Sequence, residues 1–323
     1  MSGDPGDVKP VVPYIRDGEP NEQMLAALRR SLPDVLVAPV AELDPQQLGA
    51  ARVAVIDGID ADQLASLTSL EMVQATWAGV ESVLAAVPED VHVVRMIDPQ
   101  LGLTMAEAVL TWVLYLHRDT PAYLRQQRVG QWIEHDQVLA SDRRVGILGL
   151  GALGGLAATT LRDQGFDVAG WSRSARSIDG VDCFHGSDGF GELLERSDIV
   201  VNLLPHTVAT TKLMDADAFT LLPDGASLIN VGRGATIDDD ALLAALDATS
   251  PPRLAHAVLD VFTIEPLPTD HPYWAHPGVT VLPHIAANTT PATAAVIAAA
   301  NVRAYLADGS LPDDALVDRA RGY

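Results

Sequence analysis

The sequence predicts an α/β protein made of two doubly wound parallel-sheet domains with a cleft between them. Short apolar runs bounded by Pro, Gly and Asp alternate with segments of helical spacing along most of the 323 residues, and such alternation is typical of parallel sheets. A glycine-rich turn, Gly149-x-Gly151-x-x-Gly154, follows one apolar run and opens a second series of strands and helices. The chain is long enough to form two hydrophobic cores.

The first domain is expected to comprise residues 1–103, completed by residues 286–323. Its predicted strands are apolar runs at residues 11–15, 35–39, 53–57, 73–77 and 91–96. Helical spacing predicts helices at residues 21–31 and 60–67, and Asn21 is of a residue type that caps helices.

The second domain is expected to comprise residues 104–285. A long apolar helix is predicted at residues 104–117, followed by an irregular polar stretch at 121–142. Strands are then predicted at residues 145–148, 167–171, 199–203, 227–230, 256–260 and 279–282. The last helix, predicted at residues 291–306, is rich in alanine and valine and is expected to return to the first domain.

The glycine turn indicates a dinucleotide-binding site. Gly149 permits the tight turn, Gly151 lets a pyrophosphate approach the backbone, and Gly154 lets the next helix pack against the strand. The amides at the start of that helix, near Ala152 and Leu153, would point at the phosphates. A glycine motif alone is weak evidence. The apolar strand before it and the Ala-rich helix after it favour a Rossmann-type domain over a chance glycine loop.

The end of the next strand favours NADPH over NADH. Folds specific for NAD place an Asp or Glu there to bind the ribose 2′-hydroxyl, whereas an Arg accommodates the 2′-phosphate of NADP. Here the strand is followed by Ser172, Arg173 and Arg176, with no carboxylate between them. Planar guanidinium groups bind phosphate well, and solvated loop arginines are the alternative interpretation. NADPH is therefore the predicted cofactor and NADH the alternative.

Composition limits the partners and the compartment. A net charge of −22 disfavours nucleic acid and anionic membrane surfaces, whose charges would repel the protein. No stretch reaches the roughly 18 to 20 apolar residues of a membrane span, and the polar N-terminus lacks a secretory apolar core. We therefore expect a cytoplasmic protein. The single cysteine, Cys183, is predicted to lie in a loop and excludes an internal disulfide or a cysteine-based metal cluster.

Three polar residues follow successive predicted strands of the second domain. They are Arg233, between two glycines, Glu265, and His284. Each alone has an ordinary structural explanation, but the carboxyl ends of parallel strands meet at one edge of a sheet, where ligands bind. A carboxylate beside a histidine favours the charged imidazolium, a proton donor. An arginine can hold a substrate carboxylate with two hydrogen bonds and polarise an adjacent carbonyl.

These motifs together resemble the D-isomer-specific 2-hydroxyacid dehydrogenases, and most closely their glyoxylate/hydroxypyruvate reductase A branch. The matching segments are the glycine turn, Asn-Val-Gly-Arg-Gly at 230–234, Leu-Asp-Val-Phe…Glu-Pro at 259–266 and Pro-His at 283–284. Further similarities are Trp-Ser-Arg at 171–173, Asn-Leu-Leu-Pro at 202–205, the segment 239–247 and the tail 317–323. The resemblance is strong from residue 141 onwards and looser before residue 100.

The resemblance implies a role for each site residue. His284 would protonate the carbonyl oxygen as a hydride leaves the nicotinamide, Glu265 would hold the imidazole charged, and Arg233 would grip the 2-oxo acid. Asp260 would lie near the nicotinamide, and Leu204 and Pro205 would border the cofactor. The substrate residues would be Arg233, His284, Trp77, Ala78, Gly79 and Val80, with the backbone amides of the last three holding the substrate carboxylate.

The chain also departs from the family pattern. Trp77 stands where related chains often have a small residue, and Glu81 where many have Asp. Trp77 would either narrow the substrate pocket or pack in the core of the first domain. These departures leave open which side chain the substrate carries. They do not affect the expected reduction of a 2-oxo acid.

The predicted function is an NADPH-preferring reductase of small 2-oxo acids, with glyoxylate and hydroxypyruvate as first substrates. The alternatives are a reductase of larger 2-oxo acids or a non-catalytic NAD(P)-sensing regulator, and the intact Arg/Glu/His set disfavours the regulator. The resemblance implies a homodimer that uses residues 105–116 and 121–140. No metal is expected, because His271 and His276 lie in a Pro-rich turn without a carboxylate cluster.

Overall fold

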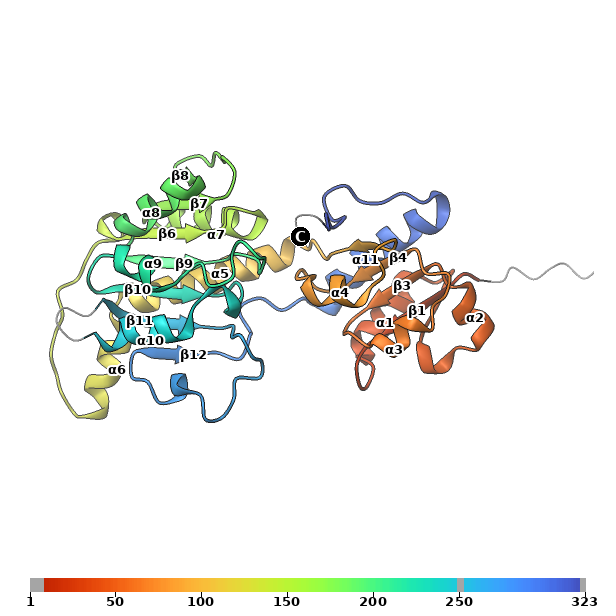
Figure 1. The fold of residues 1–323 in the computed structure, drawn as a ribbon, viewed down its shortest axis with the longest axis horizontal. Coiled ribbons are helices and arrows are strands. Elements are labelled where there is room, and N and C mark those ends of the chain that lie inside the picture. The colour runs from red at the N-terminus through yellow and green to blue at the C-terminus, as the bar shows by residue number, and fades with distance from the viewer. Residues whose placement is uncertain (1–8, 249–252, 320–323) are drawn as a thin grey trace, which may run out of the picture. The chain divides into compact units, whose positions relative to one another are not determined.

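The computed structural model describes residues 9–248 and 253–319. The polar N-terminal segment and the end of the C-terminal motif therefore fall largely outside the described residues. The chain forms two compact units, which are drawn in Figure 1. The first contains the described residues up to Leu101 together with those from Thr289 onwards, and the second contains those from Gly102 to Asn288.

The first unit contains a parallel sheet in the order β2-β1-β3-β4-β5. The strands are β1 (Val11–Ile15), β2 (Leu36–Pro39), β3 (Val53–Ile56), β4 (Met72–Ala75) and β5 (His92–Val94). The helices are α1 (Glu22–Ser31), α2 (Pro45–Ala50), α3 (Ala61–Ala65), α4 (Glu81–Ala86) and α11 (Pro291–Asp308). All residues of β3 and β4 are buried, as expected for parallel strands with both faces covered.

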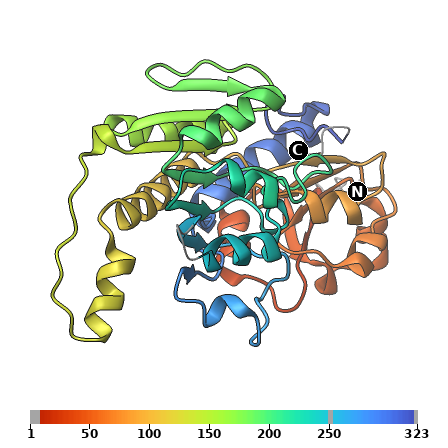
Figure 2. The ribbon, with the colours of Figure 1, turned by 60° about the vertical axis from the view of Figure 1, so that its left-hand side comes forward.

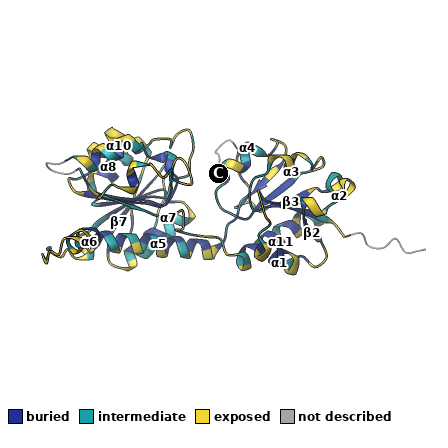
Figure 3. Ribbon diagram, turned by 90° about the horizontal axis from the view of Figure 1, so that it is seen from below, coloured by how far each residue is buried: buried dark blue, intermediate teal, exposed yellow. Residues whose placement is uncertain are grey.

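Helices cover both faces of this sheet (Figure 3). Leu25 and Leu28 of α1 pack with Ala294 and Ala298 of α11 on one face, whereas α3 and α4 contribute to the core on the other face. The side chain of Asn21 accepts a hydrogen bond from Met24 N at 3.2 Å, which confirms the predicted cap of α1.

The second unit contains a parallel sheet in the order β12-β11-β10-β9-β6-β7-β8. The strands are β6 (Arg144–Leu148), β7 (Asp167–Ser172), β8 (Asp182–His185), β9 (Ile199–Asn202), β10 (Ala226–Asn230), β11 (Leu254–Leu259) and β12 (Val279–Val281). The helices are α5 (Pro99–His117), α6 (Thr120–Arg128), α7 (Ala152–Asp163), α8 (Gly186–Arg196), α9 (Ala216–Leu221) and α10 (Asp239–Asp247). The core on one face of this sheet contains side chains of α5 and α7. The core on the other face contains side chains of α8, α9 and α10.

The predicted fold class is confirmed, and several elements differ from the prediction. The stretch 121–142 was predicted to be irregular, but the helix α6 occupies its first part. The sequence did not indicate this helix because most of its residues are polar. Helix α5 begins at Pro99, five residues before its predicted start. The short helices α2 and α4 and the strand β8 were not predicted. Strand β8 lacks the buried apolar run that indicated the other strands, because its four residues are exposed or only partly buried.

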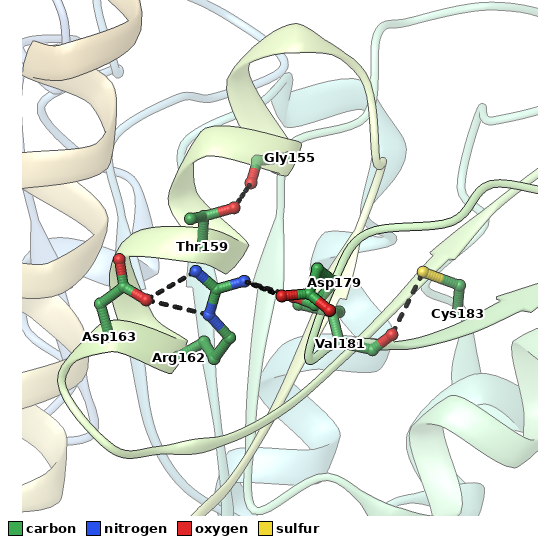
Figure 4. Close-up of polar contacts among 7 residues, drawn as sticks. All are labelled: Gly155, Thr159, Arg162, Asp163, Asp179, Val181 and Cys183. Atoms are coloured by element: carbon green, nitrogen blue, oxygen red, sulfur yellow. Dashed lines mark hydrogen bonds and ion pairs between the residues drawn. The ribbon is translucent and has the colours of Figure 1, made fainter.

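Cys183 lies in the edge strand β8 and not in the predicted loop. Its Sγ is 3.5 Å from the carbonyl oxygen of Val181. Figure 4 shows how the segment before β8 is held: Arg162 of α7 donates to the carbonyl oxygen of Asp179 and also contacts Asp163. These contacts tie the loop between β7 and β8 to the helix that follows the glycine turn.

None of the helices within residues 9–248 and 253–319 is long and apolar enough to cross a membrane. The cytoplasmic location stays a prediction.

Candidate active site at the carboxyl edge of the second sheet

The residues singled out in the second unit follow neighbouring strands of one sheet. Leu148, Asn202, Asn230, Leu259 and Val281 pair across β6, β9, β10, β11 and β12, each near the end of its strand. The glycine turn and the segments that carry Leu204, Arg233, Asp260 and His284 therefore leave the sheet at the same edge. The strand order reverses between β6 and β9, and ligands of open α/β sheets bind at the carboxyl edge near such a reversal.

The glycine turn after β6 depends on residues without side chains. Gly149 has φ of +103°, a conformation that L residues with a side chain rarely adopt. A Cβ on Gly154 would overlap the carbonyl oxygen of Gly149, whereas one on Gly151 would meet no atom within 4 Å. Gly151 is the N-cap of α7, and no side chain caps that helix. Ala152 and Leu153 begin the helix, so their end of α7 is open to an anion.

The tip of β7 presents cations and hydroxyls. Ser172 closes the strand, and its hydroxyl donates to the carbonyl oxygen of Ser174 at 2.8 Å. Arg173 and Arg176 are exposed. This donor set fits a phosphate group better than a ribose hydroxyl, which is bound by a carboxylate in NAD-specific folds.

The loop after β9 lies against the loop after β10. Leu204 is buried, and its amide donates to the Asn202 side chain at 3.2 Å. The carbonyl oxygen of Pro205 accepts a hydrogen bond from Thr210 at 2.7 Å. A Cβ on Gly232 would come within 2.8 Å of the Leu204 carbonyl oxygen. Glycine at this position therefore allows the two loops to touch.

His284 and Glu265 form a hydrogen-bonded pair. His284 Nδ1 is 2.7 Å from Glu265 Oε2, and the other carboxylate oxygen, Oε1, accepts the amide of Phe262 at 2.9 Å. The His284 side chain is 53% exposed and that of Glu265 is 34% exposed. Because Nδ1 faces the carboxylate, Nε2 is the ring nitrogen that a substrate can reach.

Asp260 holds the turn that carries His284. Its carbonyl oxygen accepts the amide of His284 at 2.9 Å. Its two carboxylate oxygens accept the amides of Ile285 and Ala286, each at 2.8 Å. Asp260 is fully buried, and His284 has φ of +55°, a conformation that costs free energy in a residue with a Cβ. These three hydrogen bonds stabilise it.

Arg233 follows β10 in extended backbone conformation, with φ of −141°. One of its terminal nitrogens donates to the carbonyl oxygen of Gly232 at 2.8 Å. A Cβ on Gly234 would overlap the backbone of Phe262, so the loop of Arg233 packs directly against the loop that leads to Glu265. Adjacent loops therefore carry the arginine and the carboxylate.

The predicted substrate loop belongs to the first unit, where it follows β4. Trp77 is half-buried against the core shared with α3 and α4, and its carbonyl oxygen accepts the amide of Met96 at 3.1 Å. Val80 is buried, and Ala78 and Gly79 are partly exposed. Part of the Trp77 side chain thus packs in the core, as one of its two interpretations requires.

Three further histidines contact neighbouring residues. His271 accepts the amide of Tyr273 at the start of a short helix, and His276 contacts Asp247 at 3.3 Å. His206 is exposed and lies 3.0 Å from the Thr211 hydroxyl. In the described part of the chain, no group of His, Cys, Asp and Glu is arranged to hold a metal ion.

Comparison with known proteins identifies the family. The model of the D-isomer specific 2-hydroxyacid dehydrogenase, NAD binding domain, matches residues 110–286. The chain belongs to this family. It is 37% identical to glyoxylate/hydroxypyruvate reductase A of Yersinia enterocolitica over 94% of this chain and 96% of that protein. As an NAD(P)-dependent dehydrogenase of this family, the protein is an oxidoreductase that interconverts 2-oxo and 2-hydroxy acids.

Solved structures of this family are similar to the chain over nearly all of its residues. A D-isomer specific 2-hydroxyacid dehydrogenase from Xanthobacter autotrophicus Py2, in complex with NADPH and MES, has a TM-score of 0.89 and 37% identity over 98% of this chain and all of that chain. An NADPH-dependent glyoxylate/hydroxypyruvate reductase from Sinorhizobium meliloti, in complex with NADP and sulfate, has a TM-score of 0.85 and 33% identity over 97% of this chain and all of that chain.

The dehydrogenase site also contains a buried polar network that sequence reasoning missed. The Asn202 side-chain amide donates to Asn230 Oδ1 at 3.0 Å and to the Thr236 hydroxyl at 2.6 Å. Thr236 and Asn230 in turn donate to the carbonyl oxygen of Arg233, at 2.6 and 3.2 Å. All three network residues are buried. The signal in the sequence was an asparagine closing each of two mostly apolar strands.

Proposed function

We propose that this dehydrogenase is an NADPH-preferring reductase of small 2-oxo acids, with glyoxylate and hydroxypyruvate as its first substrates. The hydrogen bond between His284 and Glu265 carries the proposal, because it pairs a proton donor with the anion that favours its charged form. The names of the relatives above agree with these substrates.

The two units have separate tasks in this proposal. The second unit, predicted as residues 104–285, binds the dinucleotide. The first, predicted as residues 1–103 with 286–323, binds the substrate through the loop 77–80. The division of the structure after Leu101 and after Asn288 supports these boundaries to within a few residues.

The glycine turn and the tip of β7 would hold the cofactor. Gly149, Gly151, Ala152, Leu153 and Gly154 would surround the pyrophosphate. Ser172, Arg173 and Arg176 would bind the 2′-phosphate, and Leu204, Pro205 and Asp260 would lie towards the nicotinamide. When bound, the reduced dinucleotide supplies a hydride to the carbonyl carbon of the substrate.

The proton comes from His284. The imidazolium donates the proton on Nε2 to the carbonyl oxygen of the 2-oxo acid, which becomes the hydroxyl of the product. Glu265 accepts from Nδ1 and so holds the ring orientation while stabilising its positive charge. The hydrogen bond from Phe262 to Glu265 Oε1 keeps the other carboxylate oxygen in place.

Arg233 would bind the substrate carboxylate and polarise the carbonyl. A protein with a net charge of −22 repels anions at long range, so the site needs a local cation. The amides of Ala78, Gly79 and Val80 donate to no acceptor within residues 9–248 and 253–319, which leaves them available to a carboxylate.

The dehydrogenase is also proposed to be a homodimer. We expect the dimer to use residues 105–116 and 121–140. Figure 2 shows α6 and the residues that follow it as an arm beside the rest of the second unit, and this arm corresponds to the second of these segments. Val129, Trp132 and Leu139 of this arm are 68%, 93% and 69% exposed. Several large exposed apolar side chains on one segment support an interaction surface there. Sedimentation of the wild type and of Trp132→Ser tests the proposal, since a dimer that uses the arm would dissociate more readily in the variant.

One panel of assays tests the proposed function. NADPH and NADH oxidation are measured with glyoxylate, hydroxypyruvate, pyruvate and phenylpyruvate. We expect NADPH with glyoxylate or hydroxypyruvate to give the highest kcat/KM. Highest activity with phenylpyruvate would indicate a reductase of larger 2-oxo acids, and no activity with any pair would favour a cofactor-sensing protein.

A further inference from the structure

The carboxyl edge of the first sheet carries a polar cluster that the sequence analysis did not single out. Ile15, Ile56 and Ala75 pair across β1, β3 and β4 as the last residues of their strands. The residue that follows each of these strands is polar. These residues are Arg16 after β1, Asp57 after β3 and Thr76 after β4. The strand order reverses between β1 and β3, so this cluster lies where ligands of such sheets bind.

Asp57 is the centre of the cluster. Its Oδ2 accepts the Tyr14 hydroxyl and a terminal nitrogen of Arg16, each at 2.6 Å. Its Oδ1 accepts the hydroxyl of Thr76. The Asp57 side chain is 11% exposed, and a carboxylate this buried needs such donors. Burial and the neighbouring carboxylate also raise the pKa of Tyr14, so its hydroxyl remains a donor.

Thr76 is the last residue before the proposed substrate loop, and it is fixed twice. Its amide donates to the carbonyl oxygen of Ile56 at 3.0 Å, and its hydroxyl donates to Asp57. On the other side, the amide of Met96 holds the carbonyl oxygen of Trp77. Thr76 is 2% exposed. The start of the loop is thus anchored to β3, whereas the amides of residues 78–80 remain available.

We propose that Asp57 is a positioning residue for substrate binding, which fixes the loop 77–80 through the hydroxyl of Thr76. The inference rests on the proposed function, in which the amides of this loop bind the substrate carboxylate. Because hydrogen bonds to an anion depend on the direction of each donor, a loop that rotates by a small amount binds the carboxylate less tightly.

A pair of variants separates this role from a purely structural one. Thr76→Val keeps the shape of the side chain and removes the donor to Asp57, while Thr76→Ser keeps the donor. Tyr14→Phe is the matched control, because it removes a hydroxyl that donates to the other oxygen of the same carboxylate and does not belong to the segment that enters the loop. All are compared with the wild type in steady-state reduction of glyoxylate and hydroxypyruvate, with NADPH binding measured by fluorescence and unfolding followed by circular dichroism.

We expect Thr76→Val to raise KM for both substrates about tenfold or more, with kcat within about twofold and the Kd of NADPH unchanged. Thr76→Ser should restore KM to near the wild-type value. Tyr14→Phe should lower the Tm and leave KM unchanged. An unchanged KM in Thr76→Val would overturn this inference and leave the proposed function intact. Equal changes of KM in Thr76→Val and Tyr14→Phe would do the same. A wild-type protein that reduces no 2-oxo acid would overturn the proposed function and this inference with it.

Discussion

Nδ1 of His284 lies 2.7 Å from Oε2 of Glu265, although the two residues follow different strands of the sheet. The pair forms because β11 and β12 end side by side and because each residue is held by its own loop. Asp260 accepts the amides on the His284 side, and Phe262 donates to Glu265. Both partners are therefore positioned before a substrate binds, and preorganisation of this kind favours catalysis.

Glu265→Gln should lower kcat for reduction about 10- to 100-fold, because a hydrogen bond to a charged group contributes roughly 1.5–3 kcal/mol. The glutamine keeps the size of the side chain and removes the negative charge that stabilises the imidazolium of His284 while the proton is transferred. Steady-state reduction of glyoxylate is measured for wild type and variant with saturating NADPH. An unchanged kcat would mean that the 2.7 Å contact does not act during the reaction.

Arg173→Ala should erode the preference for NADPH and leave the kinetics with NADH nearly unchanged. A charge-assisted hydrogen bond contributes roughly 1.5–3 kcal/mol, so the wild type should prefer NADPH by about one to two powers of ten in kcat/KM. The ratio of kcat/KM for the two cofactors is compared between wild type and variant. Equal use of both cofactors by the wild type would contradict the assignment of Ser172, Arg173 and Arg176.

Arg233→Lys should lower kcat/KM for glyoxylate by about tenfold or more, because an ammonium cannot reproduce two parallel hydrogen bonds to a carboxylate. Both KM and kcat should suffer, since the same guanidinium binds the substrate and polarises its carbonyl. Steady-state kinetics of the variant check this expectation. Near-native values would make Arg233 a structural turn residue and leave the amides of residues 78–80 as the carboxylate site.

His256 should make the stability of the protein depend on pH. Burial, with Arg125 and His276 nearby, lowers its pKa from 6.5 to about 4; it contacts Thr280 at 2.8 Å. Below pH 6.5 the unfolded chain binds a proton at this residue and the folded protein does not. The contribution of neutral His256 to the free energy of unfolding is therefore fully present above pH 6.5. It is lost as the pH falls towards 4, by at most about 3 kcal/mol.

Urea unfolding at several pH values measures this dependence. His256→Gln keeps a polar group near Thr280 and cannot titrate, so its free energy of unfolding should change less between pH 6.5 and pH 4. Parallel curves for the variant and the wild type would show that another group causes the acid sensitivity.

Local patterns in the sequence predicted most strands and the glycine turn. Apolar runs between turn residues, and glycines at positions where a side chain would clash, can be recognised within a few residues. The left-handed turn at His284 leaves no such signal, since it depends on the amides that Asp260 accepts. Asp57 was likewise missed, because its partners Tyr14 and Thr76 are brought together only by the pairing of β1, β3 and β4. Helix α6 was missed because it has no apolar stripe.

The most direct test of the proposed chemistry is glyoxylate-dependent NADPH oxidation by His284→Ala, with NADPH binding measured on the same preparation. General acid catalysis is worth about 10²–10⁴-fold in rate, so we expect kcat to fall by that factor while the Kd of NADPH stays at its wild-type value. A variant that binds NADPH normally and reduces glyoxylate at a near-wild-type rate would contradict the assignment of His284 as the proton donor.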